Sequence, residues 1–153
     1  MRAMTEATTS AVTADGDGGR SVRLRIPAKA EYVTLCRLAL TGLAQLRAMD
    51  AATIADIKLA LTEAVSNSVR HAYDHDADGH VDIRYDLHPG RLDIEVVDDG
   101  AGFDPDETPA FEGEELSEGG LGIAIIKTIA DEFEIESQLG VRGSRLRFTK
   151  LLN

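Results

Sequence analysis

The stretch from residue 92 to residue 103 constrains the fold more than any other part of the chain. Apolar residues alternate there with mostly polar ones, which predicts a β-strand with one apolar face. Asp98 continues the apolar face, and a buried carboxylate needs a hydrogen-bond donor, because an unpaired buried charge costs roughly 3 to 5 kcal/mol. Gly100 and Gly102 follow, and glycines let a ligand approach the backbone closely. The stretch is either a simple turn or a ligand site whose donor satisfies Asp98.

Four other segments alternate in the same way and are predicted strands. They are residues 22–26, 81–87, 133–139 and about 144–151. Apolar spacings of three and four residues predict helices over about 30–48 and 50–73, with Asp50 as the N-cap of the second, and Gly119–Gly122 opens a third helix through about residue 131. The predicted fold class is therefore α/β, a two-layer sandwich in which three helices cover one face of a mostly antiparallel five-stranded sheet. Asp98 should point toward the helices.

The first predicted helix has two sets of apolar residues. The set expected to face the core is Tyr32, Leu35, Cys36, Ala39, Leu43 and Leu46. Val33 and Leu40 lie off that stripe, so they form either a second apolar strip for a partner or scattered surface residues.

The start of the chain differs in composition from the rest. Residues 1–20 contain few bulky apolar side chains and are predicted to form a disordered tail, which leaves residues 21–153 as one domain. The acidic stretch 104–118 is too long for an ordinary connection, so it is either functional or disordered.

Charge and cysteine content exclude several classes of protein. A formal charge of -11 argues against sequence-independent binding to nucleic acid or to an anionic membrane. An anionic ligand would therefore need a local group of hydrogen-bond donors or positive charge. No apolar run approaches the ~20 residues that span a bilayer. The single Cys36 offers no disulfide framework and fits a reducing compartment. We expect a soluble cytoplasmic protein.

Polar groups line one flank of the second predicted helix. Glu63, Asn67 and His71 are four residues apart, which places them along one edge of the apolar stripe. Asn67 can offer a neutral oxygen to Mg²⁺, and Glu63 can accept a proton from an attacking hydroxyl. The helix that begins near Gly120 presents free N–H groups suited to phosphate. Solvated surface and an ordinary glycine loop are the alternatives.

Three motifs carry a resemblance to a known superfamily. Glu63-Ala-Val-Ser-Asn67-Ser-Val-Arg-His71-Ala-Tyr73, Asp98-Asp-Gly100-Ala-Gly102 and Gly119-Gly-Leu-Gly122 resemble the N, G1 and G2 boxes of the GHKL ATPases, which have the Bergerat fold. The length and the ending Gly143-Ser-Arg-Leu-Arg-Phe-Thr-Lys150 resemble the bacterial anti-sigma factors that are also serine kinases, of the stress-response and sporulation type. The match covers about residues 21 to 152.

The resemblance implies a set of roles. Asp98 accepts a hydrogen bond from the adenine amino group with help from Ser144 through water, Asn67 holds Mg²⁺, and Glu63 is the catalytic base. Residues 103–118 form the nucleotide lid, and Gly120 to Gly122 meet the phosphates of ATP. The full nucleotide-binding set is Asn67, His71, Asp98, Gly100, Gly102, Phe103, Gly119, Gly120, Leu121, Gly122 and Ser144. The implied partners are a sigma factor, an anti-anti-sigma protein of the STAS type and a second copy of the chain, with no direct contact to nucleic acid or membrane.

One feature leaves two functions open. Between Arg91 and Lys127 the chain has no Lys or Arg, so the predicted lid brings no cation to the γ-phosphate. The chain is therefore either a serine kinase or a binding module in which ATP only orders the lid and a partner is sequestered. A detached histidine kinase domain is a third interpretation, but no helix pair bears a phospho-acceptor histidine.

Overall fold

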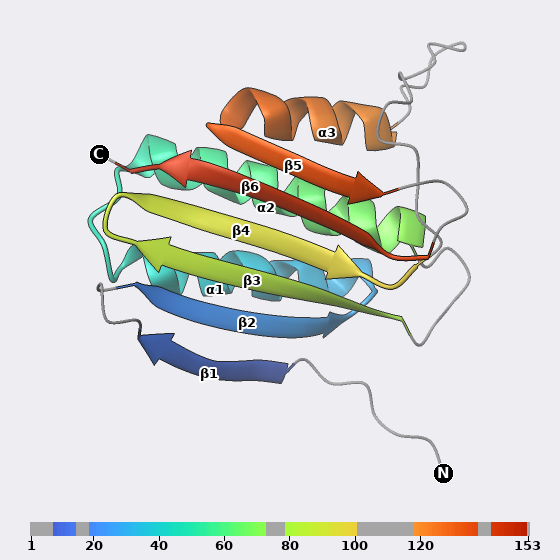
Figure 1. Ribbon diagram of the computed structural model, residues 1–153, viewed down its shortest axis with the longest axis horizontal. Coiled ribbons are helices and arrows are strands. Elements are labelled where there is room, and N and C mark those ends of the chain that lie inside the picture. Colours follow the sequence, from blue (N-terminus) through green and yellow to red (C-terminus); the bar gives the residue numbers. More distant parts are fainter. Residues whose placement is uncertain (1–7, 15–18, 73–78, 101–117, 138–141, 153) are drawn as a thin grey trace.

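In the part of the chain that the structure describes, six strands form one sheet and three helices cover one of its faces (Figure 1). The structure, a computed structural model, describes residues 8–14, 19–72, 79–100, 118–137 and 142–152. The strand order is β1-β2-β3-β4-β6-β5, and every neighbouring pair is antiparallel. The strands are β1 (Thr8–Ala14), β2 (Arg20–Pro27), β3 (His80–His88), β4 (Arg91–Asp98), β5 (Glu132–Ser137) and β6 (Ser144–Leu151).

The helices are close to their predicted positions. A 3₁₀ turn (Ala30–Tyr32) leads into α1 (Val33–Ala44), and α2 (Ala51–Ala72) and α3 (Glu118–Ile129) follow in chain order. The side chain of Asp50 accepts a hydrogen bond from the N–H of Thr53 at 2.7 Å, so the predicted N-cap of α2 is confirmed. The predicted fold class is also confirmed, with one strand more than expected.

The additional strand, β1, lies in the segment predicted to be a disordered tail. That prediction is wrong for Thr8–Ala14, which pairs with β2 from Thr8 opposite Arg25 to Ala14 opposite Arg20. The prediction counted only apolar side chains. A strand that joins an exposed edge gains backbone hydrogen bonds without needing bulky side chains, and Thr and Val suit strands well.

The alternation in β4 sets the side of the sheet on which Asp98 lies. Leu92, Ile94 and Val96 are buried together with Asp98 on the helix-covered face, as predicted. The stripe predicted for α1 is confirmed for Cys36 and Leu43, which are buried, and for Tyr32 and Ala39, which pack against the core. It is wrong for Leu35 and Leu46, which are exposed, and Val33 and Leu40 are buried in their place. The true core residues of α1 also recur at steps of three and four, so spacing alone could not choose between the two faces. They are Val33, Cys36, Leu40, Leu43 and Ala44.

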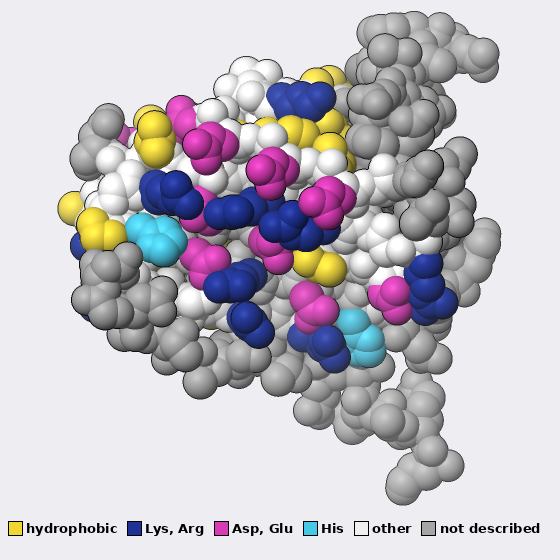
Figure 2. All heavy atoms as spheres, in the orientation of Figure 1, with side chains coloured by type: hydrophobic (Ala, Val, Ile, Leu, Met, Phe, Trp, Pro, Cys, Tyr) yellow, Lys and Arg dark blue, Asp and Glu magenta, His cyan; other side chains and the backbone are white. Residues whose placement is uncertain are grey.

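The outer face of the sheet is charged, with Arg, Lys, Asp and Glu side chains interspersed over it (Figure 2). One row in register across five strands reads Arg23, Arg84, Glu95, Arg147 and Glu134. Asp93 is buried within this face, where burial acts to raise its pKa, but the Thr149 hydroxyl and Arg91 hold that pKa below its usual value. In the described ranges, no helix has the length and apolar character needed to cross a membrane.

Candidate functional site

Asp98 lies at the end of β4, where the chain leaves the sheet. Its carboxylate is buried and accepts a hydrogen bond from the N–H of Gly100 at 3.0 Å. Ser144, directly opposite in β6, donates its hydroxyl to the other carboxylate oxygen. The resemblance implied a contact through water, but the two residues are paired in register, which brings the hydroxyl to the carboxylate directly. Two donors therefore orient Asp98 and leave its oxygens able to accept another hydrogen bond.

Gly143 connects the two strand ends at this place. It has a φ of +93°, and its N–H donates to the carbonyl of Gly100 at 2.7 Å. A side chain is disfavoured at this φ, so glycine is needed for the turn that delivers Ser144 to Asp98. The sequence analysis named Gly143 only as the first residue of the ending that carries the resemblance, without a role in the site. Its position immediately before the last strand was the available signal.

The ion pair between Asp99 and Arg142 crosses the same strand ends. Their side chains are 2.9 Å apart and both are largely exposed. Hydrogen bonding from Arg142 and its charge hold the pKa of Asp99 below its usual value. Exposed pairs of this kind add little stability, so this one contributes little to the fold.

The polar flank of α2 contains a buried oxygen to which no described residue donates a hydrogen bond. Asn67 is 2% exposed, and its Oδ1 has no hydrogen-bond partner within the described part of the chain. A buried unpaired acceptor is unfavourable, and it is the neutral oxygen that Mg²⁺ accepts as a ligand. Asn67 therefore fits the metal role that the resemblance implied. Glu63, one turn earlier, is half-buried, and His71 belongs to α2 but its side chain lies outside what is described.

The N-terminal part of α3 lies against Glu63. The two helices α2 and α3 pack side by side on the sheet (Figure 1). Gly122 is buried, and a Cβ atom at that position would lie 2.8 Å from Oε2 of Glu63. Gly119, Gly120 and Leu121 form the preceding turn of the helix, as predicted for a glycine-started helix. The candidate base and the candidate phosphate-binding helix end are thus in direct contact.

The predicted residues fall into two clusters and a remainder. Asp98, Gly100 and Ser144 form one cluster, and Glu63 with Gly122 forms the other. The side chains of Asp98 and Asn67 are both buried. Gly102, Phe103 and the lid up to residue 117 lie outside the described residues.

A basic residue on α2 escaped the sequence analysis. Arg70 follows Asn67 by three positions and Glu63 by seven, so it lies on the same flank of the helix. Its side chain is half-buried, and its Nε atom is buried. The sequence analysis considered cations only between Arg91 and Lys127. The helical spacing of three residues from Asn67 was the signal that points to Arg70.

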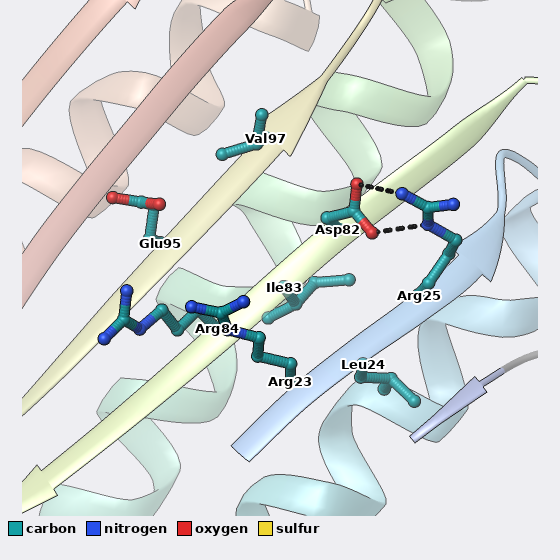
Figure 3. A pocket seen from close by; sticks show the side chains of 8 residues that line it. All are labelled: Arg23, Leu24, Arg25, Asp82, Ile83, Arg84, Glu95 and Val97. Atoms are coloured by element: carbon teal, nitrogen blue, oxygen red, sulfur yellow. Dashed lines mark hydrogen bonds and ion pairs between the residues drawn. The ribbon is translucent and has the colours of Figure 1, made fainter. Parts of the chain in front are cut away.

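A separate hollow of about 550 Å³ lies on the outer face of the sheet. Figure 3 shows Arg23, Arg84 and Glu95 extending from three neighbouring strands around it, with Val97 beside them. None of the residues implied by the three motifs lines this hollow. We place the candidate site on the opposite face, because the buried Asp98, the buried amide of Asn67 and the glycine-started helix are all there.

This combination defines a class of protein. An antiparallel sheet under three helices, an acid held at a strand end and a polar helix flank beside a glycine-started helix are the features of a nucleotide-binding domain of the GHKL type. Residues 26–150 match the family model described as "Histidine kinase-like ATPase domain", and the chain belongs to this family. The resemblance to the GHKL ATPases is thereby confirmed, and ATP is the nucleotide of the family.

Individual relatives within this family are also similar to the chain. The chain is 37% identical over 140 residues to the serine-protein kinase RsbW of Bacillus subtilis, with 86% of each chain covered. It is 36% identical over 128 residues to the RsbW of Listeria innocua, which covers 78% of this chain and 82% of the relative. Among solved structures, one that holds the RsbU and RsbW domains of a Mycobacterium tuberculosis protein contains the same fold, with a TM-score of 0.61 and 24% identity over 86% of this chain and 33% of that one.

Proposed function

We propose that this protein is an ATP-dependent protein serine kinase that also acts as an anti-sigma factor. The observation that carries the proposal is the pair formed by Glu63 and Asn67, one turn apart on α2, with Glu63 next to Gly122 near the start of α3. The identity to serine-protein kinases over most of the chain supports the same activity. The proposed substrate is a serine of an anti-anti-sigma protein of the STAS type.

Asp98 and Ser144 select the base of the nucleotide in this proposal. The carboxylate of Asp98 is buried and already oriented by Gly100 and Ser144, so it can accept a hydrogen bond from the exocyclic amino group of adenine. An oriented acceptor loses little entropy on binding. Guanine has a carbonyl in place of this amino group, and its oxygen would face the carboxylate unfavourably.

Glu63 is the proposed base and Asn67 the proposed metal ligand. The serine oxygen forms a bond to the γ-phosphorus while the bond from that phosphorus to the bridging oxygen breaks, ADP leaves, and the hydroxyl proton passes to Glu63. Bound Mg²⁺ supplies charge stabilisation to the phosphates. The flank position of Arg70, one turn beyond Asn67, makes it our candidate for the cation that the lid does not provide.

The partners are part of the same proposal. We propose that the protein binds a sigma factor in one state and the STAS-type protein in another, that it forms a homodimer, and that it acts in the cytoplasm without contacting nucleic acid or membrane directly. The formal charge of -11 supports the last point, since a strongly acidic protein is repelled by polyanions.

The test is transfer of phosphate to a purified STAS-type protein encoded by the same organism. Incubation with Mg-ATP should produce phosphoserine, and Glu63→Gln, which keeps the size of the side chain but cannot accept the proton, should lower the rate by about 10²-fold or more. Absence of phosphoserine with every such protein would refute the kinase.

The alternative is a binding module that does not transfer phosphate. It is favoured by the absence of Lys and Arg between Arg91 and Lys127. In that case ATP-dependent capture of a sigma factor would persist in the Glu63→Gln variant, and no phosphoserine would form.

A further inference from the structure

Gly122 occupies a helical position where glycine is unfavourable. It is the fifth residue of α3, inside the helix, where alanine would restrict the unfolded chain and favour the helix. Its φ is not in the left-handed region, so the backbone does not require glycine there. Another reason must explain the missing side chain.

The reason is the contact with Glu63. A Cβ on Gly122 would lie 2.8 Å from Oε2 of Glu63, while the Cβ and Cδ atoms of Glu63 would be at 3.7 and 3.8 Å. Only the carboxylate oxygen is too close, since the other two distances are ordinary van der Waals contacts. A methyl group would therefore leave the two helices in place and displace the end of the Glu63 side chain.

We propose that Gly122 is a positioning residue for Glu63. Its missing side chain lets the carboxylate lie against the N-terminal part of α3, the same part that is proposed to meet the phosphates. The orientation of the base is thus tied to the helix end that holds the nucleotide. This inference rests on the proposed function of Glu63, and it assigns to Gly122 a role beyond close approach to phosphate.

A matched pair of variants tests the proposal. Gly122→Ala and Gly42→Ala both replace a helical glycine, but a Cβ on Gly42 would have no atom within 4 Å. Both variants should therefore fold and gain stability, with Tm raised by roughly 2 to 4 °C. Only Gly122→Ala should lower kcat for serine phosphorylation, by about tenfold or more, with KM for ATP changed by less than about threefold.

A second measurement is independent of turnover. In nucleotide-free protein, the ¹³Cδ resonance of Glu63 should shift in Gly122→Ala and not in Gly42→Ala, because the carboxylate oxygen has to retreat to at least about 3.4 Å from the new methyl. In the Glu63→Gln background, adding Gly122→Ala should reduce the residual rate no further, since the base is already absent.

The outcomes separate cleanly. An unchanged kcat in Gly122→Ala, or a higher KM for ATP with an unmoved Glu63 resonance, would overturn the positioning role and leave only contact with phosphate. A wild-type protein without kinase activity would refute the proposed function instead, and the Glu63 resonance would still decide whether Gly122 positions that side chain.

Discussion

Replacing Asn67 with leucine should make the protein more stable and less able to bind its nucleotide. Asn67 is 2% exposed, and its Oδ1 has no partner among the described residues. Leaving a buried acceptor unsatisfied costs about 1–3 kcal/mol, and an apolar side chain of similar shape removes that cost. After allowance for imperfect packing of leucine, we expect the free energy of unfolding to rise by about 1 kcal/mol, or Tm by roughly 2 to 4 °C for a chain of this length.

The order of stability should reverse when Mg-ATP is present. A ligand at 100 times its dissociation constant stabilises the folded state by about 2.7 kcal/mol, which exceeds the gain expected from Asn67→Leu. Wild type should therefore unfold at the higher temperature in Mg-ATP, and Asn67→Leu should unfold at the higher temperature without it. Differential scanning calorimetry and urea denaturation of both proteins, each with and without Mg-ATP, measure the two orders of stability.

Ser68→Ala provides the control on the next residue of α2, which is also buried. It should respond to Mg-ATP as wild type does. A nucleotide-free Asn67→Leu protein that is less stable than wild type would refute our view that the amide oxygen is unsatisfied. Equal stabilisation of Asn67→Leu and wild type by Mg-ATP would refute its role as a metal ligand.

Further predictions concern the adenine end of the site and two buried titrating groups. Asp98→Asn should weaken ATP binding at least tenfold, or ~1.4 kcal/mol, and Ser144→Ala should weaken it less, about three- to tenfold, both by isothermal titration calorimetry; unchanged affinity in Asp98→Asn would contradict adenine recognition there. Burial raises the pKa of Cys36 from 9.0 to about 12, so the stability that the protonated thiol contributes to the fold should be complete below pH 9 and lost as pH rises toward 12. Iodoacetamide should therefore label the folded protein slowly at pH 9, and fast labelling would contradict the burial of Cys36. Asp93 has a lowered pKa despite its burial, so its contribution to the free energy of unfolding should be present above about pH 4 and lost below it. Asp93→Asn should therefore reduce the loss of stability at acidic pH, as measured by urea denaturation.

Periodicity determined which side of each element faces the core wherever one pattern dominated. The strict alternation of β4 placed Asp98 on the helix-covered face, and the spacing along α2 placed Asn67 at the edge of the buried stripe. The N-cap Asp50 was also predicted correctly from the sequence, because a helix cap depends on residues close together in the chain. These features are local, so the sequence alone determined them.

The tertiary structure decided everything that depends on how elements meet. Two stripes of α1 had suitable spacing, and only packing against the sheet selected the one with Val33 and Leu40. The addition of β1 required a free edge on β2, and the contact of Ser144 with Asp98 required the register between β4 and β6. The three motifs predicted that Glu63 and Gly122 serve one nucleotide site. The contact between them arises only where α2 and α3 pack together, because the distance between two helices is set by packing and not by the period of either one.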